Sequence, residues 1–203
     1  ALVVGDLLQN LVLRTRPYEA EPGAADALYR RWDTAAQEFL QFSGDVPSLG
    51  RHLGFGGLVD RIVADFDALV LRPEPRRPRV GIVGEILVKF HPDANNNVID
   101  VIESEGCEAV LPGMLPFFLM GLYSARFRAD ALGIGDRSVA LKRLAVWVVE
   151  QYQRPVARCN GKFDTPPKMK DLAAKADDII SLGTLAGEGC SPSRVRTLSS
   201  YPS

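Results

Sequence analysis

Residues 79–97, RVGIVGEILVKFHPDANNN, are the stretch of sequence that decides the fold. The stretch opens with the apolar run VGIVG at residues 80–84, which is rich in β-branched side chains and follows several prolines. Such a run is typical of a strand buried on both faces of a parallel sheet. Polar residues follow at once, and in open α/β sheets ligands bind beyond the carboxyl ends of the strands. The stretch therefore predicts an α/β fold with a ligand-facing loop after its first strand.

The sequence upstream of this stretch contains helical patterns only. Apolar residues recur at helical spacing in three segments, 1–14, 24–42 and 47–71. The run RPEPRRP at residues 72–78 then excludes a helix interior, because it holds three prolines. We therefore expect a helical layer over residues 1–75, packed on a small Rossmann-like lobe with a parallel sheet over residues 76–189.

Strand and helix patterns alternate downstream of the prolines, as in α/β proteins. A strand at 79–84 precedes a helix at 96–105, which Gly106 ends, and a second strand at 107–111. Further helices are expected at 115–131, at 137–153 before a break at Arg154-Pro155, and at 167–182. Residues 190–203 are rich in serine, arginine and proline, which predicts a disordered or aberrant tail.

The composition excludes several classes of function. The chain has 203 residues, 24% of them charged, and a formal net charge of −1, so its charge gives no reason to expect a nucleic-acid or membrane-surface partner. No apolar run approaches the roughly 20 residues that span a bilayer, and a cytoplasmic location is expected. The three cysteines, Cys107, Cys159 and Cys190, are far apart and form no pair with metal-ligand spacing. The sequence therefore predicts no metal site.

The densest polar cluster lies in the loop after the first strand. Its candidate ligand-binding residues are Glu85, Lys89, His91, Asn95, Asn96 and Asn97. One interpretation is a ligand loop, with an anion received at the start of the helix near Asn96. The alternative is that one asparagine caps this helix while the other residues face water. Glu85 is the hardest to explain in this second way, since a carboxylate at a strand end is exposed, paired or bound.

A second polar group, TRPYE at residues 15–19, follows the first helix. Arg16, Tyr18 and Glu19 are candidates for a docking feature. The same residues are also consistent with an ion-paired helix end that packs against the α/β lobe. Both interpretations stay open at the level of the sequence.

Three parts of the sequence carry a family resemblance. The first is TRPYE at 15–19 with Gly23 and a tyrosine–tryptophan helix behind it. The second is GIVGEILVKFHPDANNN at 81–97, followed by ESEG at 103–106 and LPG at 111–113, and the third is GEG at 187–189. Over most of residues 1–189 the chain resembles the large activase-like proteins related to 2-hydroxyacyl-CoA dehydratases and benzoyl-CoA reductases. These are iron–sulfur proteins of anaerobic bacteria.

The resemblance implies a protein that couples ATP hydrolysis to low-potential electron transfer toward acyl-CoA-like substrates. An actin-like ATPase activase module, or the remaining parts of a parent protein, would be the partner. The chain looks like part of the cluster-bearing half, without the ATPase, and none of its cysteines matches a ligand position of the iron–sulfur cluster. We therefore expect this chain alone to be inactive and to bind no cofactor, supplying scaffold and a ligand-facing loop.

The sequence also departs from the family pattern after residue 189, where the family continues as GEGW and this chain turns to CSPSR. Truncation or a changed reading frame is expected there, and the helical start at Ala1 suggests a missing N-terminal part. The alternative function is a non-catalytic interaction module or a truncated remnant of the family.

Overall fold

The computed structural model describes residues 1–119, 121–122 and 139–158 of the chain. These residues form a mixed α/β structure that is mostly helical and includes a small parallel strand pair. The described residues group into two compact units, one of 1–80, 99–110 and 152–158 and the other of 81–98, 111–119, 121–122 and 139–151. The predicted helix at 167–182 and the tail at 190–203 lie outside the described residues.

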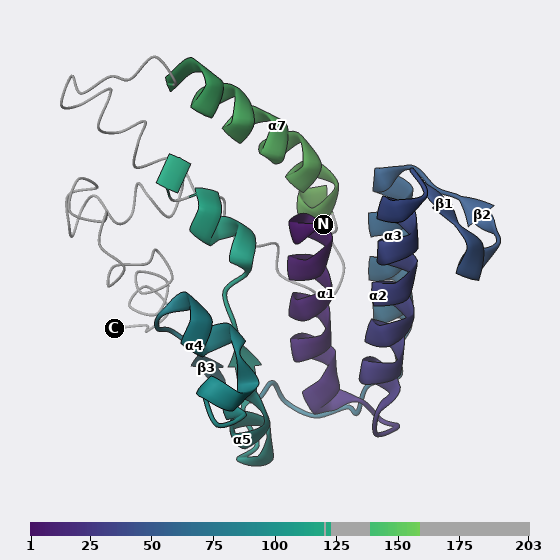
Figure 1. Ribbon diagram of the computed structural model, residues 1–203. Coiled ribbons are helices and arrows are strands. Elements are labelled where there is room, and N and C mark those ends of the chain that lie inside the picture. The colour runs from purple at the N-terminus through teal and green to yellow at the C-terminus, as the bar shows by residue number, and fades with distance from the viewer. Residues whose placement is uncertain (120, 123–138, 159–203) are drawn as a thin grey trace. The chain divides into compact units, whose positions relative to one another are not determined.

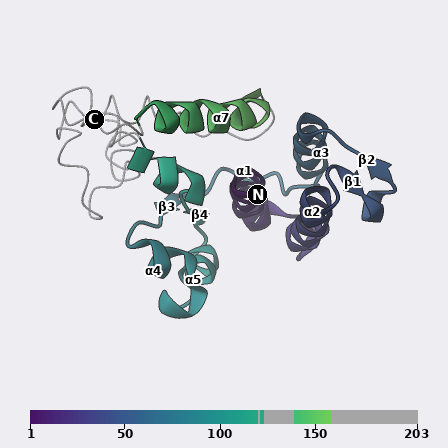
Figure 2. The same cartoon turned by 45° about the horizontal axis from the view of Figure 1, so that its top comes forward.

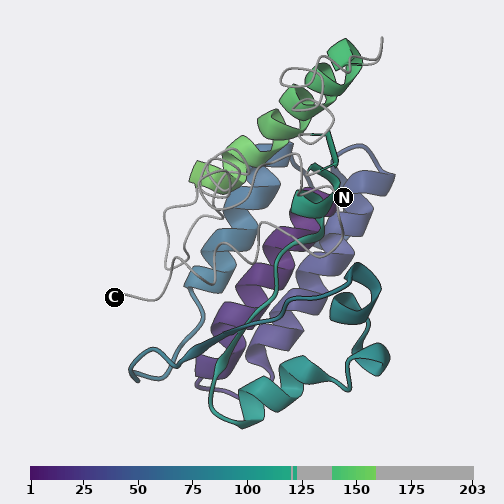
Figure 3. The same cartoon turned by 90° about the vertical axis from the view of Figure 1, so that its left-hand side faces the viewer.

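Three helices form the core of the first unit: α1 (Leu2–Thr15), α2 (Ala24–Gln41) and α3 (Phe55–Asp67). All three contact one another, and they lie side by side in Figures 1 and 3. Trp32 and Phe66 are almost fully buried between them. The indole Nε1 of Trp32 also donates a hydrogen bond of 3.0 Å to Asp65, which joins α2 to α3. Burial of each aromatic ring contributes roughly 1.5–3 kcal/mol to the folded state.

The third helix starts later than the sequence suggested. Residues 47–52, which were expected to be helical, form instead the short 3₁₀ helix η2 (Pro47–Leu49) and the strand β2 (Arg51–His52), which pairs antiparallel with β1 (Asp45–Val46). Gly50 ends this 3₁₀ helix in the left-handed region at φ 61°, a conformation that favours glycine. The turn-forming residues Pro47 and Gly50 therefore determine the structure at the start of this segment, although its apolar period predicted a helix over 47–71.

A small sheet follows the proline-rich run. Strand β3 (Arg79–Gly81) and strand β4 (Glu108–Val110) form a parallel pair, and they lie beside each other in Figure 2. Between them the chain forms α4 (Ile86–Phe90), the 3₁₀ helix η3 (Pro92–Ala94) and α5 (Val98–Ser104). Gly106, at φ 76°, follows α5 in the left-handed conformation expected for a residue that ends a helix.

The burial of the two strands corrects the sequence prediction. All three residues of β3 are exposed, so the expectation of a first strand buried on both faces is wrong. The buried strand is β4, where Glu108 and Ala109 are each only 1% exposed and which packs against α1. Among the described residues this sheet has two strands, so both lie at an edge, and the difference in burial comes from α1, which packs against β4.

The described part of the chain ends with two helical segments. Residues 114–119 and 121–122 are helical, whereas the rest of the predicted helix at 115–131 lies outside the described residues. Helix α7 (Val139–Arg158) continues through Pro155, so the predicted break at Arg154-Pro155 is wrong. Pro155 lies in the last turn, where a proline removes one backbone hydrogen bond of the helix and leaves the preceding turns intact.

Candidate functional site

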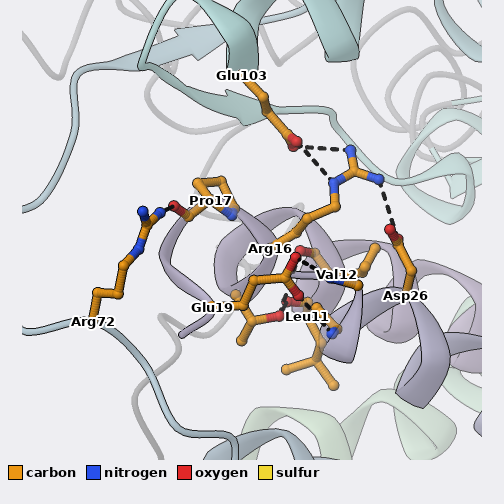
Figure 4. Close-up of polar contacts among 11 residues, drawn as sticks. Leu11, Val12, Arg16, Pro17, Glu19, Asp26, Arg72 and Glu103 are labelled. Carbon is orange, nitrogen blue, oxygen red and sulfur yellow. Dashed lines mark hydrogen bonds and ion pairs between the residues drawn. The ribbon is translucent and has the colours of Figure 1, made fainter. Parts of the chain in front are cut away.

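The TRPYE segment carries the chain out of α1 and into α2. Thr15 is fully buried, and its hydroxyl donates a hydrogen bond of 2.8 Å to the carbonyl of Leu11 in the preceding turn. The 3₁₀ helix η1 (Arg16–Tyr18) follows directly, with Pro17 buried. The carbonyl of Pro17 accepts a hydrogen bond of 2.7 Å from the guanidinium of Arg72 (Figure 4). The side chains of Arg16 and Tyr18 point from this segment toward other parts of the same unit.

Arg16 joins the end of α1 to α5. Its Nε and Nη2 donate hydrogen bonds of 2.8 and 2.9 Å to the two carboxylate oxygens of Glu103, and its Nη1 lies 3.3 Å from Asp26 in α2 (Figure 4). Burial lowers the pKa of Arg16, but its hydrogen bond and charge interaction with Glu103 outweigh burial, and the pKa is raised. The bidentate contact between Arg16 and Glu103 fixes the direction of these two side chains.

Tyr18 reaches the strand β4. Its hydroxyl donates a hydrogen bond of 3.0 Å to Oε2 of Glu108 and accepts one of 2.9 Å from the backbone N–H of Arg77. The guanidinium of Arg77 also lies over the tyrosine ring, 5.6 Å from its centre. Burial raises the pKa of Tyr18, and the carboxylate of Glu108 raises it further, because both disfavour a phenolate at this position.

Glu108 is the centre of this polar network. Its side chain is 1% exposed, and Arg76 donates hydrogen bonds of 3.2 Å to each of its oxygens. The Nε atoms of Arg14 and Arg79 each lie 3.8 Å from Oε1 of the same carboxylate. A buried carboxylate is stable only with such partners. Helix α1, the proline-rich run, β3 and β4 therefore meet at one charged group.

Glu19 has a different local role. Its carboxylate accepts hydrogen bonds of 2.7 Å from the N–H of Gly23 and 2.8 Å from the N–H of Ala25, at the start of α2. An acidic group there satisfies backbone donors that have no partner within the helix. All three docking candidates of the TRPYE segment thus have partners within their own unit, and a docking role for them stays a prediction.

Glu85, in the second unit, caps α4. Its backbone is extended, and Oε2 accepts hydrogen bonds of 2.8 Å from the N–H of Leu87 and 3.2 Å from the N–H of Val88. These contacts are those of an N-cap residue. The two backbone N–H groups are thus hydrogen-bond partners for a carboxylate that was expected to be exposed, paired or bound.

The other loop candidates differ in exposure. The amide of Asn95 donates to the carbonyl of Val88 at 3.0 Å and accepts at 3.2 Å from the N–H of Val98, at the start of α5. Asn96 and Asn97 are exposed and adopt positive φ of 56° and 53°, and His91 is exposed as well. Lys89 is only 6% exposed, with its ammonium 5.1 Å from the ring centre of Phe90. A ligand-binding role for this loop stays a prediction.

Other reactive side chains have structural partners or stand apart. His52 Nδ1 lies 2.8 Å from Asp45 Oδ1 across the β1–β2 pair, where both side chains are exposed. Cys107, directly before β4, is a free thiol, while Cys159 and Cys190 lie outside the described residues. In the part of the chain that the structure describes, no group of three or more histidine, cysteine, aspartate or glutamate side chains is placed to hold a metal ion. None of the described helices has both the length and the apolar character that a bilayer crossing requires.

Sequence reasoning missed Glu108 and its arginines. The available signal was a lone carboxylate inside the apolar strand pattern CEAVL at 107–111, which demands a cationic partner if the strand is buried. The arginines of the run RPEPRRPR at 72–79 were the obvious source of such a partner. Every buried side-chain nitrogen and oxygen atom among the described residues has a hydrogen-bond partner.

No protein-family model matches the chain, and neither does any curated protein or solved structure.

Proposed function

We propose that this chain is a scaffold segment of a 2-hydroxyacyl-CoA dehydratase/activase-type iron–sulfur protein of the cytoplasm. The parent protein would couple ATP hydrolysis on an actin-like module to low-potential electron transfer toward acyl-CoA-like substrates. The support for the family is the resemblance at residues 15–19, 81–97 and 187–189. In this proposal the β3–β4 pair, with α4 and α5 between its strands, is one piece of a Rossmann-like lobe that other parts of the parent complete.

The observation that carries the scaffold role is the network around Glu108. Its carboxylate receives hydrogen bonds from Tyr18 and Arg76, and Arg14 and Arg79 lie 3.8 Å away. These four partners come from α1, η1, the proline-rich run and β3. A charged group that ties four segments together performs a structural task, because its loss would release all four contacts at once.

An anaerobic reconstitution tests the scaffold role. The full chain is incubated with ferrous iron, sulfide and a thiol reductant, then desalted and measured for visible charge-transfer absorption and for bound iron. We expect neither to be retained, because the cysteine ligands would come from the rest of the parent protein. Stoichiometric iron with an absorbing cluster would contradict this role.

Titration of coenzyme A into the chain tests the ligand-facing loop. The exposed residues His91 and Asn96 lie where a ligand would have access to the loop. We expect saturable heat that the H91A/N96A double variant abolishes and that an exposed control outside the loop, Glu105→Gln, leaves unchanged. Identical titrations for all three proteins would remove the loop from the proposal.

A second candidate function, a non-catalytic interaction module, is favoured by helix α7. Its large apolar side chains Leu141, Leu144, Trp147, Val148 and Tyr152 are 39–67% exposed and recur at helical spacing. Such a stripe is typical of a helix that packs against another surface. Sedimentation of the wild type and of a W147E/L144E variant distinguishes the two candidate functions. Only for an interaction module do we expect the chains to associate through α7 and the variant to lose this association.

A further inference from the structure

The proline-rich run between α3 and β3 has an unusually restricted backbone. Residues 72–78 read RPEPRRP and form neither helix nor strand. The rings of Pro73, Pro75 and Pro78 fix φ, and the residue before each of them is confined to extended conformations. Only Arg76 among these seven residues escapes both restrictions. The run is therefore extended because of its own covalent chemistry.

The contacts of the run show a period of three residues. Arg76 and Arg79 both approach Oε1 of Glu108, at 3.2 and 3.8 Å. Arg77 lies instead over Tyr18 and forms an ion pair of 3.0 Å with Glu74, three residues before it. A repeat of three residues is that of the polyproline II helix, and Arg79, the first residue of β3, continues the same extended backbone. Two of the three edges of this helix thus face the body of the unit.

The third edge carries Pro75 and Pro78, and both are exposed. The regular stretch begins at Glu74, because the N–H of Glu74 donates a 2.9 Å hydrogen bond to the carbonyl of Arg72, a bend at Pro73. Pro75 and Pro78 have the P-x-x-P spacing that aromatic-lined grooves recognise in polyproline II ligands. With three arginines and one glutamate, residues 74–79 have a net charge of +2, which complements a groove with an acidic rim.

We propose that residues 74–79 form a docking segment for a partner protein with an aromatic-lined groove and an acidic rim. The segment is held in its binding conformation before the partner arrives, through Tyr18 and Glu108, so little ordering remains to be done on binding. The proposal is independent of the electron-transfer role, because it depends on the proline spacing, the charge, the exposed edge and the anchoring contacts of the segment itself.

Calorimetric titration of the full chain with an SH3, a WW and an EVH1 domain tests this proposal. We expect saturable binding to at least one of them, weakened about tenfold or more in the P75A/P78A variant. The matched control is P22A/P92A, which changes two exposed prolines elsewhere and leaves the affinity unchanged. A synthetic peptide of residues 70–82 should compete with the chain, which gives a readout that does not depend on folding of the variants.

Several results would overturn the proposal. These are no saturable binding to any of the three domains up to about 1 mM, equal affinities for P75A/P78A and wild type, or no competition by the peptide. Binding that disappears at high salt and is equally strong toward heparin would show a charge interaction with polyanions and would also overturn it.

Discussion

The substitution Glu108→Gln removes one charge and keeps the shape of the side chain. The carboxylate is 1% exposed and lies near three guanidinium groups, so the variant leaves buried positive charge without its counter-charge. Breaking a buried ion pair costs about 3–5 kcal/mol. The side chains of Arg76 and Arg79 are 45% and 37% exposed and regain water, which reduces the cost to about 2–3 kcal/mol.

Urea unfolding measures this loss. Trp32 is buried among the three helices and Trp147 is exposed, and the chain has two tryptophans, so a Trp147→Phe background reports on the helical unit alone. With a slope of roughly 1.5 kcal/mol per molar urea, a loss of 2–3 kcal/mol moves the midpoint down by about 1–2 M. The matched control is Glu105→Gln, the same chemical change at an exposed position three residues away.

A double-mutant cycle identifies the source of the loss. Arg76→Met combined with Glu108→Gln should cost less than the sum of the two single changes, with a coupling of about 1–3 kcal/mol. Equal midpoints for Glu108→Gln and Glu105→Gln, or an additive cycle, would refute the reasoning that this carboxylate organises the unit.

Three further predictions test other features. Tyr18→Phe should flatten the dependence of stability on pH above pH 10. The pKa of Tyr18 is raised above the ordinary tyrosine value of 10.0, so its contribution to stability is present below pH 10 and is lost as pH rises through the folded pKa. Unfolding midpoints between pH 8 and 11 measure this, and parallel profiles for the variant and the wild type would contradict it. Glu85→Ala should weaken α4 by about 0.5–2 kcal/mol through the lost cap, seen as faster hydrogen exchange of the Leu87 amide, and unchanged exchange would argue against the cap. Gly44→Ala should lower the stability by about 1–3 kcal/mol, since φ is 105° and a Cβ would lie 2.8 Å from the carbonyl oxygen of Leu53. Thermal melts measure this loss, and Gly50→Ala, with open space at its Cβ position, is the milder control. Equal losses of stability in the two variants would disprove the steric argument.

The helices were the most predictable part of the fold. The patterns at 1–14 and 24–42 agree with α1 (Leu2–Thr15) and α2 (Ala24–Gln41), because no proline interrupts the apolar period of either stretch. At 47–71 the same period held only from residue 55 onward. There the turn residues Pro47, Gly50 and Gly54 formed a hairpin and a late helix start instead.

Burial of the strands was less predictable. The β-branched run at 80–84 has the composition of a central strand, but in the described part of the chain β3 pairs with β4 alone, and its three residues are exposed. Strand burial depends on which segments cover the sheet, and that is a property of distant sequence. The same distance explains why Glu108 was overlooked, since its partners lie 29 to 94 positions earlier in the chain.

For the candidate site residues, the need for a polar partner was predictable from the sequence, but the identity of the partner was not. Glu85 was expected to be exposed, paired or bound, and it accepts hydrogen bonds from the start of α4. The sequence also allowed an ion-paired helix end at Arg16, and the structure gives this residue a partner in Glu103, 87 positions later. Local chemistry thus predicted that these side chains need partners, whereas only the tertiary arrangement shows which partners they have.

The central claim is that this network joins distant segments into one scaffold. Native-state hydrogen exchange of the Glu108 amide tests this claim most directly. This N–H donates a 2.8 Å hydrogen bond to the carbonyl of Pro78 in the proline-rich run. If the network is the scaffold of the unit, the Glu108 amide opens only with the whole unit and is protected as strongly as the amide of Leu11 in α1. Exchange of the Glu108 amide many times faster than that of Leu11 would contradict the account, because β4 would then separate from the helices without unfolding them.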